Sequence, residues 1–307
     1  MLHGMSTANL PLEWPNESSS PVISGTTWSH PGSNICLDFH GDPCRAKLVV
    51  FSDGNHHMAL EECLQVFLEK HPEAEDIFYA TTPPGVLVQL IKQGQIQLGN
   101  LRLSRQPDVF IGPQNILLQL EQDGHVQAPE LFMRSRCNVM LVAKDNPKNI
   151  LGIRDLLRKD VSLFMSNPKT ETASYQVYTE TLFNLAKEQG LPVTGFEKLF
   201  SSDSKKVLYG ECIHHRELPQ SIAQGHADVA VVYYHLALRY TRIFPKRFQI
   251  VPLGGTEDNP QATPAHHITD YYAGIVNLEN KLSELLMNHL LSGQTTEIYT
   301  YHGLVRP

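Results

Sequence analysis

The residues best suited to binding chemistry form a polar stretch at 166–175, which reads Ser-Asn-Pro-Lys-Thr-Glu-Thr-Ala-Ser-Tyr. A short apolar run at 161–165 precedes it, and apolar residues recur at helical spacing through 173–189. A strand that ends in small polar residues directly before a helix leaves backbone N–H groups unpaired at the positive end of the helix dipole. The stretch therefore predicts an anion site, with an ordinary helix cap as the simpler interpretation.

Similar polar turns end other apolar runs of the chain. The turn at 52–55 follows the run 48–51, the turn at 80–82 follows 77–79, and Tyr233 closes the run 227–233. Ligands of parallel sheets lie beyond the carboxyl ends of the strands. The side chains that can donate hydrogen bonds to an oxyanion there are Asn55, Thr81, Thr82, Thr172 and Tyr233. In the alternative interpretation, the two threonines only precede a Pro-Pro turn and Tyr233 is a core aromatic.

Histidines offer a second kind of chemistry. The chain has 15 of them, with adjacent pairs at 56–57, 214–215 and 266–267. The first two pairs fall on different strand-end turns, near Glu171 and Glu217. Two imidazoles and two carboxylates can bind a divalent transition metal. The alternative to anion binding is thus a metal site formed by His56, Glu171, His215 and Glu217.

Catalytic motifs are not found in the sequence. It has no nucleophile elbow, no phosphate-binding glycine loop, no HExxH and no zinc-finger spacing. Nothing pairs the two glutamates with a nucleophile. The sequence predicts a protein that is not an enzyme and that needs no cofactor.

Composition narrows the class of partner. The 307 residues carry a formal net charge of -7, which disfavours non-specific nucleic-acid binding. No apolar window is long enough for a membrane span, and the first residues lack the pattern of a secretory signal. If Met1 is the natural start, the protein is expected to be intracellular. The five scattered cysteines indicate neither a disulfide scaffold nor a structural zinc site.

Strand–turn–helix units recur along the chain and predict an α/β fold with parallel sheets. The first series begins at Lys47, the pattern restarts at Cys137, and a strand returns at 271–276. We therefore expect an irregular N-terminal extension at 1–45 and two lobes. Lobe I comprises 46–132 plus 268–307, and lobe II comprises 133–267. A cleft between two lobes is a preferred site for a small ligand.

Several of these segments, in this order and spacing, resemble a known family. They are 48–55 (Leu-Val-Val-Phe-Ser-Asp-Gly-Asn), 107–112 (Pro-Asp-Val-Phe-Ile-Gly), 166–168, 231–233 and 301–305 (Tyr-His-Gly-Leu-Val). From Leu48 to its end, the chain resembles the type II solute-binding proteins of ABC importers, most closely those for molybdate and tungstate. The resemblance implies a two-lobed periplasmic-binding-protein fold, hinge closure on a small oxyanion, a location outside the cytoplasm and an ABC permease as partner. A ligand sensor built on the same fold is a further alternative.

The resemblance also implies binding residues. The family's first two ligand loops match Asn55 and the region of Thr82, the third matches Glu171, Thr172, Ala173 and Ser174, the fourth matches His215, Arg216 and Glu217, and a closing tyrosine matches Tyr233. In the archaeal branch, two carboxylates complete an octahedral shell around the metal of the oxyanion, and Glu171 and Glu217 stand at those positions. The family's first loop is usually Ala/Gly-Ser, whereas 53–57 here reads Asp-Gly-Asn-His-His. This departure bears on which oxyanion is bound.

The two glutamates give the sharpest expectation. We expect their carboxylates to point into one shared site. If they bind an octahedral centre or a cation, changing either to Gln should weaken binding strongly. If a tetrahedral anion is held by N–H and O–H donors, the same change should preserve or improve affinity, because a like charge is removed.

Overall fold

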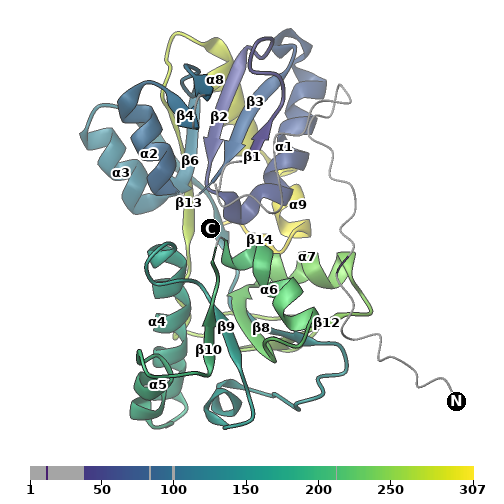
Figure 1. Cartoon of the computed structure of the whole chain (residues 1–307). Coiled ribbons are helices and arrows are strands. Elements are labelled where there is room, and N and C mark those ends of the chain that lie inside the picture. Colours follow the sequence, from purple (N-terminus) through teal and green to yellow (C-terminus); the bar gives the residue numbers. More distant parts are fainter. Residues whose placement is uncertain (1–11, 13–37, 83, 99–100, 212) are drawn as a thin grey trace, which may run out of the picture. The chain divides into compact units, whose positions relative to one another are not determined.

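The computed structural model describes residues 12, 38–82, 84–98, 101–211 and 213–307 (Figure 1). Two compact units can be separated. The middle unit contains Leu12 and Arg136–Ile268, and the terminal unit contains the described residues from Asp38 to Ser135 together with Thr269–Pro307. The chain thus passes between the units after Ser135 and again after Ile268.

The terminal unit is built on a seven-stranded sheet of order β1-β3-β2-β6-β13-β7-β14. Its strands are β1 (Asp38–His40), β2 (Leu48–Ser52), β3 (Ile77–Thr81), β6 (Val109–Pro113), β7 (Gln127–Ser135), β13 (Asp270–Ile275) and β14 (Leu304–Val305). A separate hairpin joins β4 (Ile96–Leu98) and β5 (Leu101–Leu103). The strands β3, β2 and β6 are parallel, so their carboxyl ends share one edge of the sheet.

Helices cover both faces of this sheet (Figure 1). They are α1 (His57–Lys70), α2 (Pro84–Gln93), α3 (Gln114–Gln122), α8 (Lys281–Leu290) and α9 (Gly293–Tyr301), with 3-10 turns η2 (Gly54–His56) and η3 (Pro72–Ala74). Side chains alternate along β2, so Leu48 and Val50 pack in a core with α1, α8 and α9. Val49 and Phe51 pack on the other face with α2 and α3. Burial on both faces explains why β2 is a continuous apolar run.

One strand lies inside the segment expected to be irregular. The residues of β1 pair antiparallel with β3, in the register Asp38 with Thr81 and His40 with Tyr79. Phe39 is buried against Phe78, which anchors the strand. The expectation of an irregular extension to residue 45 is thus wrong for 38–40, because backbone pairing there continues the sheet beyond β3. Residues 1–11 and 13–37 lie outside the described part of the chain.

The middle unit has a five-stranded sheet of order β10-β9-β11-β8-β12. Its strands are β8 (Asn138–Ala143), β9 (Leu163–Met165), β10 (Val207–Tyr209), β11 (Val229–Tyr233) and β12 (Phe248–Pro252). Its helices are η4 (Ile153–Leu157), α4 (Thr172–Glu188), α5 (Val193–Leu199), α6 (His214–Ala223) and α7 (Tyr234–Ile243). The strands β10, β9 and β11 run parallel, and β8 is antiparallel to its neighbours.

Candidate functional site

Each unit brings polar residues together at the carboxyl edge of its parallel strands. In the terminal unit, Ser52 and Thr81 are the last residues of β2 and β3 and are paired in register. In the middle unit, β9, β10 and β11 end at Met165, Tyr209 and Tyr233. Ligands of α/β sheets bind at this edge. The residues singled out in the sequence lie at these strand ends or in the turns and helix starts that follow them.

In the middle unit, the turn after β9 is tied to the segment after β10. The Asn167 side-chain Nδ2 donates to the carbonyl of Gly210 at 3.0 Å, and the Gly210 N–H donates to Met165 at 3.2 Å. The Asn167 carbonyl accepts the N–H of Glu171, which caps α4. Rigid turns of this kind fix where the following helix begins.

The first turn of α4 leaves its donors available. The first N–H of α4 that bonds to a preceding carbonyl is that of Tyr175, which donates to Glu171 at 3.0 Å. Within the described residues, the N–H groups of Thr172, Ala173 and Ser174 make no hydrogen bond. They stand at the positive end of a helix of 17 residues. Three such groups at a helix start can hold an anion.

The carboxylates of Glu171 and Glu217 lie together around the start of α6. Glu171 Oε2 accepts the backbone N–H of His214 at 2.9 Å, and Glu217 Oε2 accepts that of Glu211 at 2.9 Å. Burial raises the pKa of Glu171 to about 7, the His214 N–H partly offsets this, and the negative charge of Glu217 raises it further. The two side chains are therefore close neighbours in one unit. Their direct role in binding stays a prediction.

The helix α6 begins at His214. His215 and Glu217 thus lie in the first turns of a helix rather than on a loop. The sequence misleads because Pro219 lies inside α6 and cannot donate to the His215 carbonyl. That carbonyl instead accepts a hydrogen bond from the hydroxyl of Tyr240, so the helix continues through the proline.

Aromatic and polar side chains pack behind this edge. Tyr233 is 2% exposed, its ring lies 5.3 Å from that of Tyr178, and its backbone hydrogen-bonds the Tyr178 hydroxyl. His214 stacks on Phe164, and burial lowers its pKa to about 3. The ring is therefore neutral at physiological pH. Ser166 is fully buried, and its hydroxyl has no hydrogen-bond partner among the residues with a described position.

In the terminal unit, the turn after β2 contains a buried carboxylate. Asp53 is 3% exposed, and its Oδ1 accepts the backbone N–H of Asn55 at 2.7 Å. Burial raises the pKa of Asp53 to about 6, and the Asn55 N–H partly offsets this rise. The Asn55 N–H is thus already occupied, which leaves its side-chain amide for the role predicted from the sequence.

The predicted threonines end β3 beside this turn. Thr81 and Thr82 are each 2% exposed. The Thr82 N–H donates to Ser52 at 3.1 Å, whereas its Oγ1 is buried without a partner in the described part of the chain. A buried hydroxyl without a partner is energetically unfavourable. It is therefore a candidate for contact with a solute.

The metal set proposed from the sequence is not assembled. His56 is fully buried in the terminal unit, with Nδ1 3.0 Å from the Tyr299 hydroxyl and Nε2 3.3 Å from Ser52 Oγ. Glu171, His215 and Glu217 belong to the middle unit. Among the described residues, no group of three or more His, Cys, Asp or Glu side chains is arranged to hold a metal ion. His56 is a core residue because both its ring nitrogens have partners.

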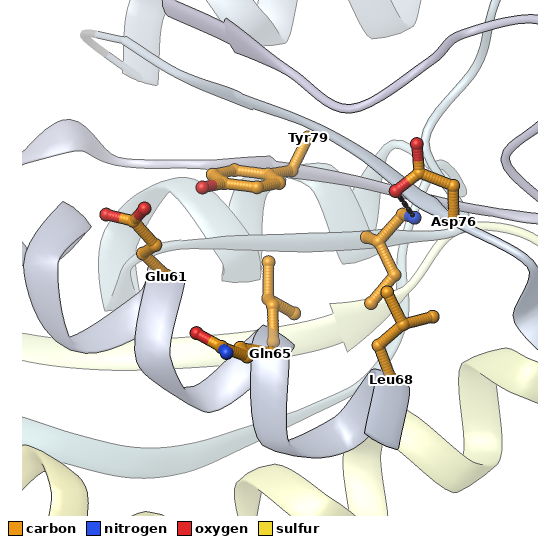
Figure 2. Close-up of a pocket in the computed structure, with 7 residues that line it drawn as sticks. Glu61, Gln65, Leu68, Asp76 and Tyr79 are labelled. Carbon is orange, nitrogen blue, oxygen red and sulfur yellow. Dashed lines mark hydrogen bonds between the residues drawn. The ribbon is translucent and has the colours of Figure 1, made fainter. Parts of the chain in front are cut away.

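A small pocket in the terminal unit lies between α1 and β3 (Figure 2). Figure 2 shows Glu61 and Gln65 of α1 on one side and the ring of Tyr79 on the other. The pocket has space for roughly one water molecule. Burial raises the pKa of Glu61 to about 7, and Asp76 lies at the same pocket. Its size and its two carboxyl groups make it unsuitable for an oxyanion.

Sequence reasoning did not choose two buried residues near the strand edges, Asp53 and Tyr178. Ser166 was included, as the first residue of the polar stretch predicted to bind an anion. Asp53 follows a buried strand directly, which is the signal that could have identified it. The position of Tyr178 behind Tyr233 depends on how α4 packs on the sheet and is not readable locally.

Comparisons with known proteins agree with this architecture. The sequence profile of a family described as bacterial extracellular solute-binding protein matches residues 48–305. A comparison with curated proteins gives no match to the sequence. No helix among the described residues combines the length and apolar character needed to cross a bilayer.

Several solved structures share the fold. The periplasmic molybdate-binding protein of Azotobacter vinelandii has 14% identity and a TM-score of 0.58 over 85% of this chain and 100% of that one. The sulfate-binding protein of Mycobacterium tuberculosis has 14% identity and a TM-score of 0.60 over 84% and 85%. PEB3 of Campylobacter jejuni with L-phospholactate bound has 14% identity and a TM-score of 0.59 over 85% and 100%. At this identity, the likeness establishes a type II periplasmic-binding-protein fold with two α/β sheets, as the sequence predicts.

Proposed function

We propose that this chain, which belongs to the family of bacterial extracellular solute-binding proteins, reversibly binds a small oxyanion. The observation that carries the proposal is the start of α4, where the N–H groups of Thr172, Ala173 and Ser174 have no hydrogen-bond partner in the described chain. Such groups favour an anion both by hydrogen bonding and through the helix dipole.

Two further features support an oxyanion. The buried hydroxyls of Ser166 and Thr82, which lack partners within the described residues, follow strand ends in the middle and terminal units. Structures with the same fold include proteins named for molybdate and for sulfate, and one with L-phospholactate bound. These three ligands share a small, negatively charged, oxygen-rich group. Molybdate and tungstate are the first solutes to test.

Calorimetric titration of the full chain tests the proposal. The anions are molybdate, tungstate, sulfate and phosphate, and the cations are zinc and nickel. We expect saturable binding of at least one anion and no binding of either cation. The variant Thr172→Pro should weaken anion binding, because it removes one N–H from the start of α4. Silence with all four anions, together with saturable zinc binding, would overturn the proposal in favour of a metal site.

An ABC permease is the corresponding partner, to which a solute-binding protein would deliver its anion. Hinge closure of the two units on the solute, as the resemblance implies, stays a prediction. Both belong to the same proposal, because a transporter partner has a role only if the chain binds a transportable solute.

A further inference from the structure

We propose that Thr181 is a positioning residue, which couples an anion at the start of α4 to the two ends of the middle-unit segment Arg136–Ile268. The inference rests on the proposed oxyanion-binding function and concerns how binding brings about hinge closure. Thr181 lies about 14 Å further along α4 than Thr172, at about 1.5 Å per residue, so it acts without touching the anion.

The hydroxyl of Thr181 uses its full hydrogen-bonding capacity. The residue is 0% exposed, and its Oγ1 donates to the carbonyl of Val177 at 2.9 Å. The same oxygen accepts from Asn138 Nδ2 at 2.8 Å and from the His267 N–H at 3.0 Å. A hydroxyl has one hydrogen to donate and two lone pairs, so all three are occupied. Two of these bonds leave α4 and hold other segments of the chain against it.

Those segments are the ones that connect this part of the middle unit to the terminal unit. The chain passes between the units after Ser135 and again after Ile268. Asn138 begins β8 just after the first passage, and His267 comes just before the second. Asn138 Nδ2 also donates to the carbonyl of His267 at 3.3 Å, which ties the two segments to each other. One oxygen of the helix whose start is proposed to bind the anion therefore holds both connections.

A helix transmits a displacement along its length because its backbone is hydrogen-bonded throughout. A shift of the first turn of α4 toward a bound anion would therefore reach Thr181. Asn138 and His267 would follow, because a buried donor that loses its acceptor is unfavourable. Thr179 differs from Thr181 on this point, since its Oγ1 donates to carbonyls within α4 itself. It is 7% exposed and provides a matched control on the same helix.

The test begins with calorimetric titration of the full chain with molybdate, tungstate, sulfate and phosphate. Small-angle X-ray scattering then follows the radius of gyration at saturation with whichever of these four binds most tightly. We expect wild-type protein to become more compact on binding. Thr181→Val removes the hydroxyl at similar size, so it should lose most of this compaction and bind about tenfold more weakly, because closure no longer adds to affinity. Thr181→Ser and Thr179→Val should behave as wild type.

Folding is controlled separately. Thr181→Val leaves the His267 N–H buried without this acceptor, so thermal unfolding verifies that the variant is folded at the temperature of the titration. Asn138→Ala is a second variant, which releases the first segment from Thr181 and keeps the bond from His267. It should reduce compaction in the same direction. Compaction at saturation is the decisive measurement, because a change in stability alone would not alter it.

Three outcomes would overturn the inference and leave the proposed function intact. They are unchanged compaction in both Thr181→Val and Asn138→Ala, anion binding by wild-type protein without compaction, and a loss of compaction in Thr179→Val as large as that in Thr181→Val. If none of the four anions binds to wild-type protein, the proposed function itself is wrong, and this inference fails with it.

Discussion

The terminal and middle units place acidic groups at equivalent edges of their sheets, one of them buried and two of them partly buried, but arrange them differently. In the terminal unit, Asp53 stands alone and accepts one N–H from its own turn. In the middle unit, Glu171 and Glu217 form a close pair, each bonded to an N–H near the start of α6. The same chemical group therefore serves one local turn in one unit and joins two separate segments in the other.

The two edges also differ in which hydrogen-bonding groups lack a partner in the described chain. In the middle unit, the carboxylates occupy N–H groups at α6, while the first turn of α4 keeps its own N–H groups available. In the terminal unit, the N–H groups of Asn55 and Thr82 are both occupied, and the buried hydroxyl of Thr82 lacks a partner within the described residues. Each edge therefore offers a donor of its own kind, backbone N–H groups in the middle unit and a side-chain hydroxyl in the terminal unit.

The largest effect is expected from Glu171→Gln. The folded-state pKa is raised from 4.5 to about 7, so the folded protein holds an extra proton between these pH values and loses stability as pH rises through them. Gln keeps the acceptor for the His214 N–H without the charge. The variant should therefore be more stable than wild type by about 1–3 kcal/mol at pH 8, with no difference near pH 4. Urea unfolding at both pH values measures this.

A similar gain in stability is expected at the sheet edge of the terminal unit. Asp53→Asn should also be stabilising at pH 8, and the difference in stability from wild type should develop as the pH rises from 3.8 to about 6.

Anion affinity tests the role of Glu171 separately. We expect Glu171→Gln to preserve or improve molybdate and phosphate binding, because a like charge is removed. A loss of about 2–5 kcal/mol in binding would instead mean that the carboxylate touches the bound species directly.

The second effect tests whether the α4 N–H groups supply the affinity. Thr172→Pro removes one of them at the first helical position, where proline is well tolerated. Its matched control, Thr172→Ala, keeps the N–H and loses only the bond from the hydroxyl to the Pro168 carbonyl. We expect Thr172→Pro to weaken phosphate or molybdate binding by about 10- to 100-fold, as for one lost hydrogen bond to a charge. Equal affinities of the two variants would assign the anion to another part of the molecule.

Much of the fold could be predicted because buried parallel strands are apolar on both faces. The runs at 48–51 and 77–79 indicated their strands for this reason, and the helical spacing through 173–189 indicated most of α4. The strand β7 was missed because its first half is largely exposed and polar, so neither an apolar run nor a clean alternation marks it. The short edge strand β10 was missed because three residues carry no period.

The sequence indicated where the residues of the candidate site lie, but not which of them are hydrogen-bonded to one another. Strand ends in the sequence indicated where Asn55, Thr82 and Glu171 lie. The bond from His214 to Glu171 joins residues 43 apart, and it depends on the adjacency of β9 and β10, which the sequence does not specify. Asp53 was passed over because an Asp in a polar turn usually signals a cap. It is indeed a cap here, and only its burial distinguishes it.

The smallest effects are expected when the two buried hydroxyls, one at each sheet edge, are removed. Thr82→Val and Ser166→Ala each remove a hydroxyl that lacks a partner within the described residues, so each should stabilise the solute-free protein by about 0.5–1 kcal/mol. Each should also weaken phosphate binding about three- to tenfold if the hydroxyl donates to the anion. Thermal unfolding without solute and titration with phosphate separate these two consequences. A loss of affinity confined to Ser166→Ala would assign the anion to the middle unit and leave Thr82 outside the site.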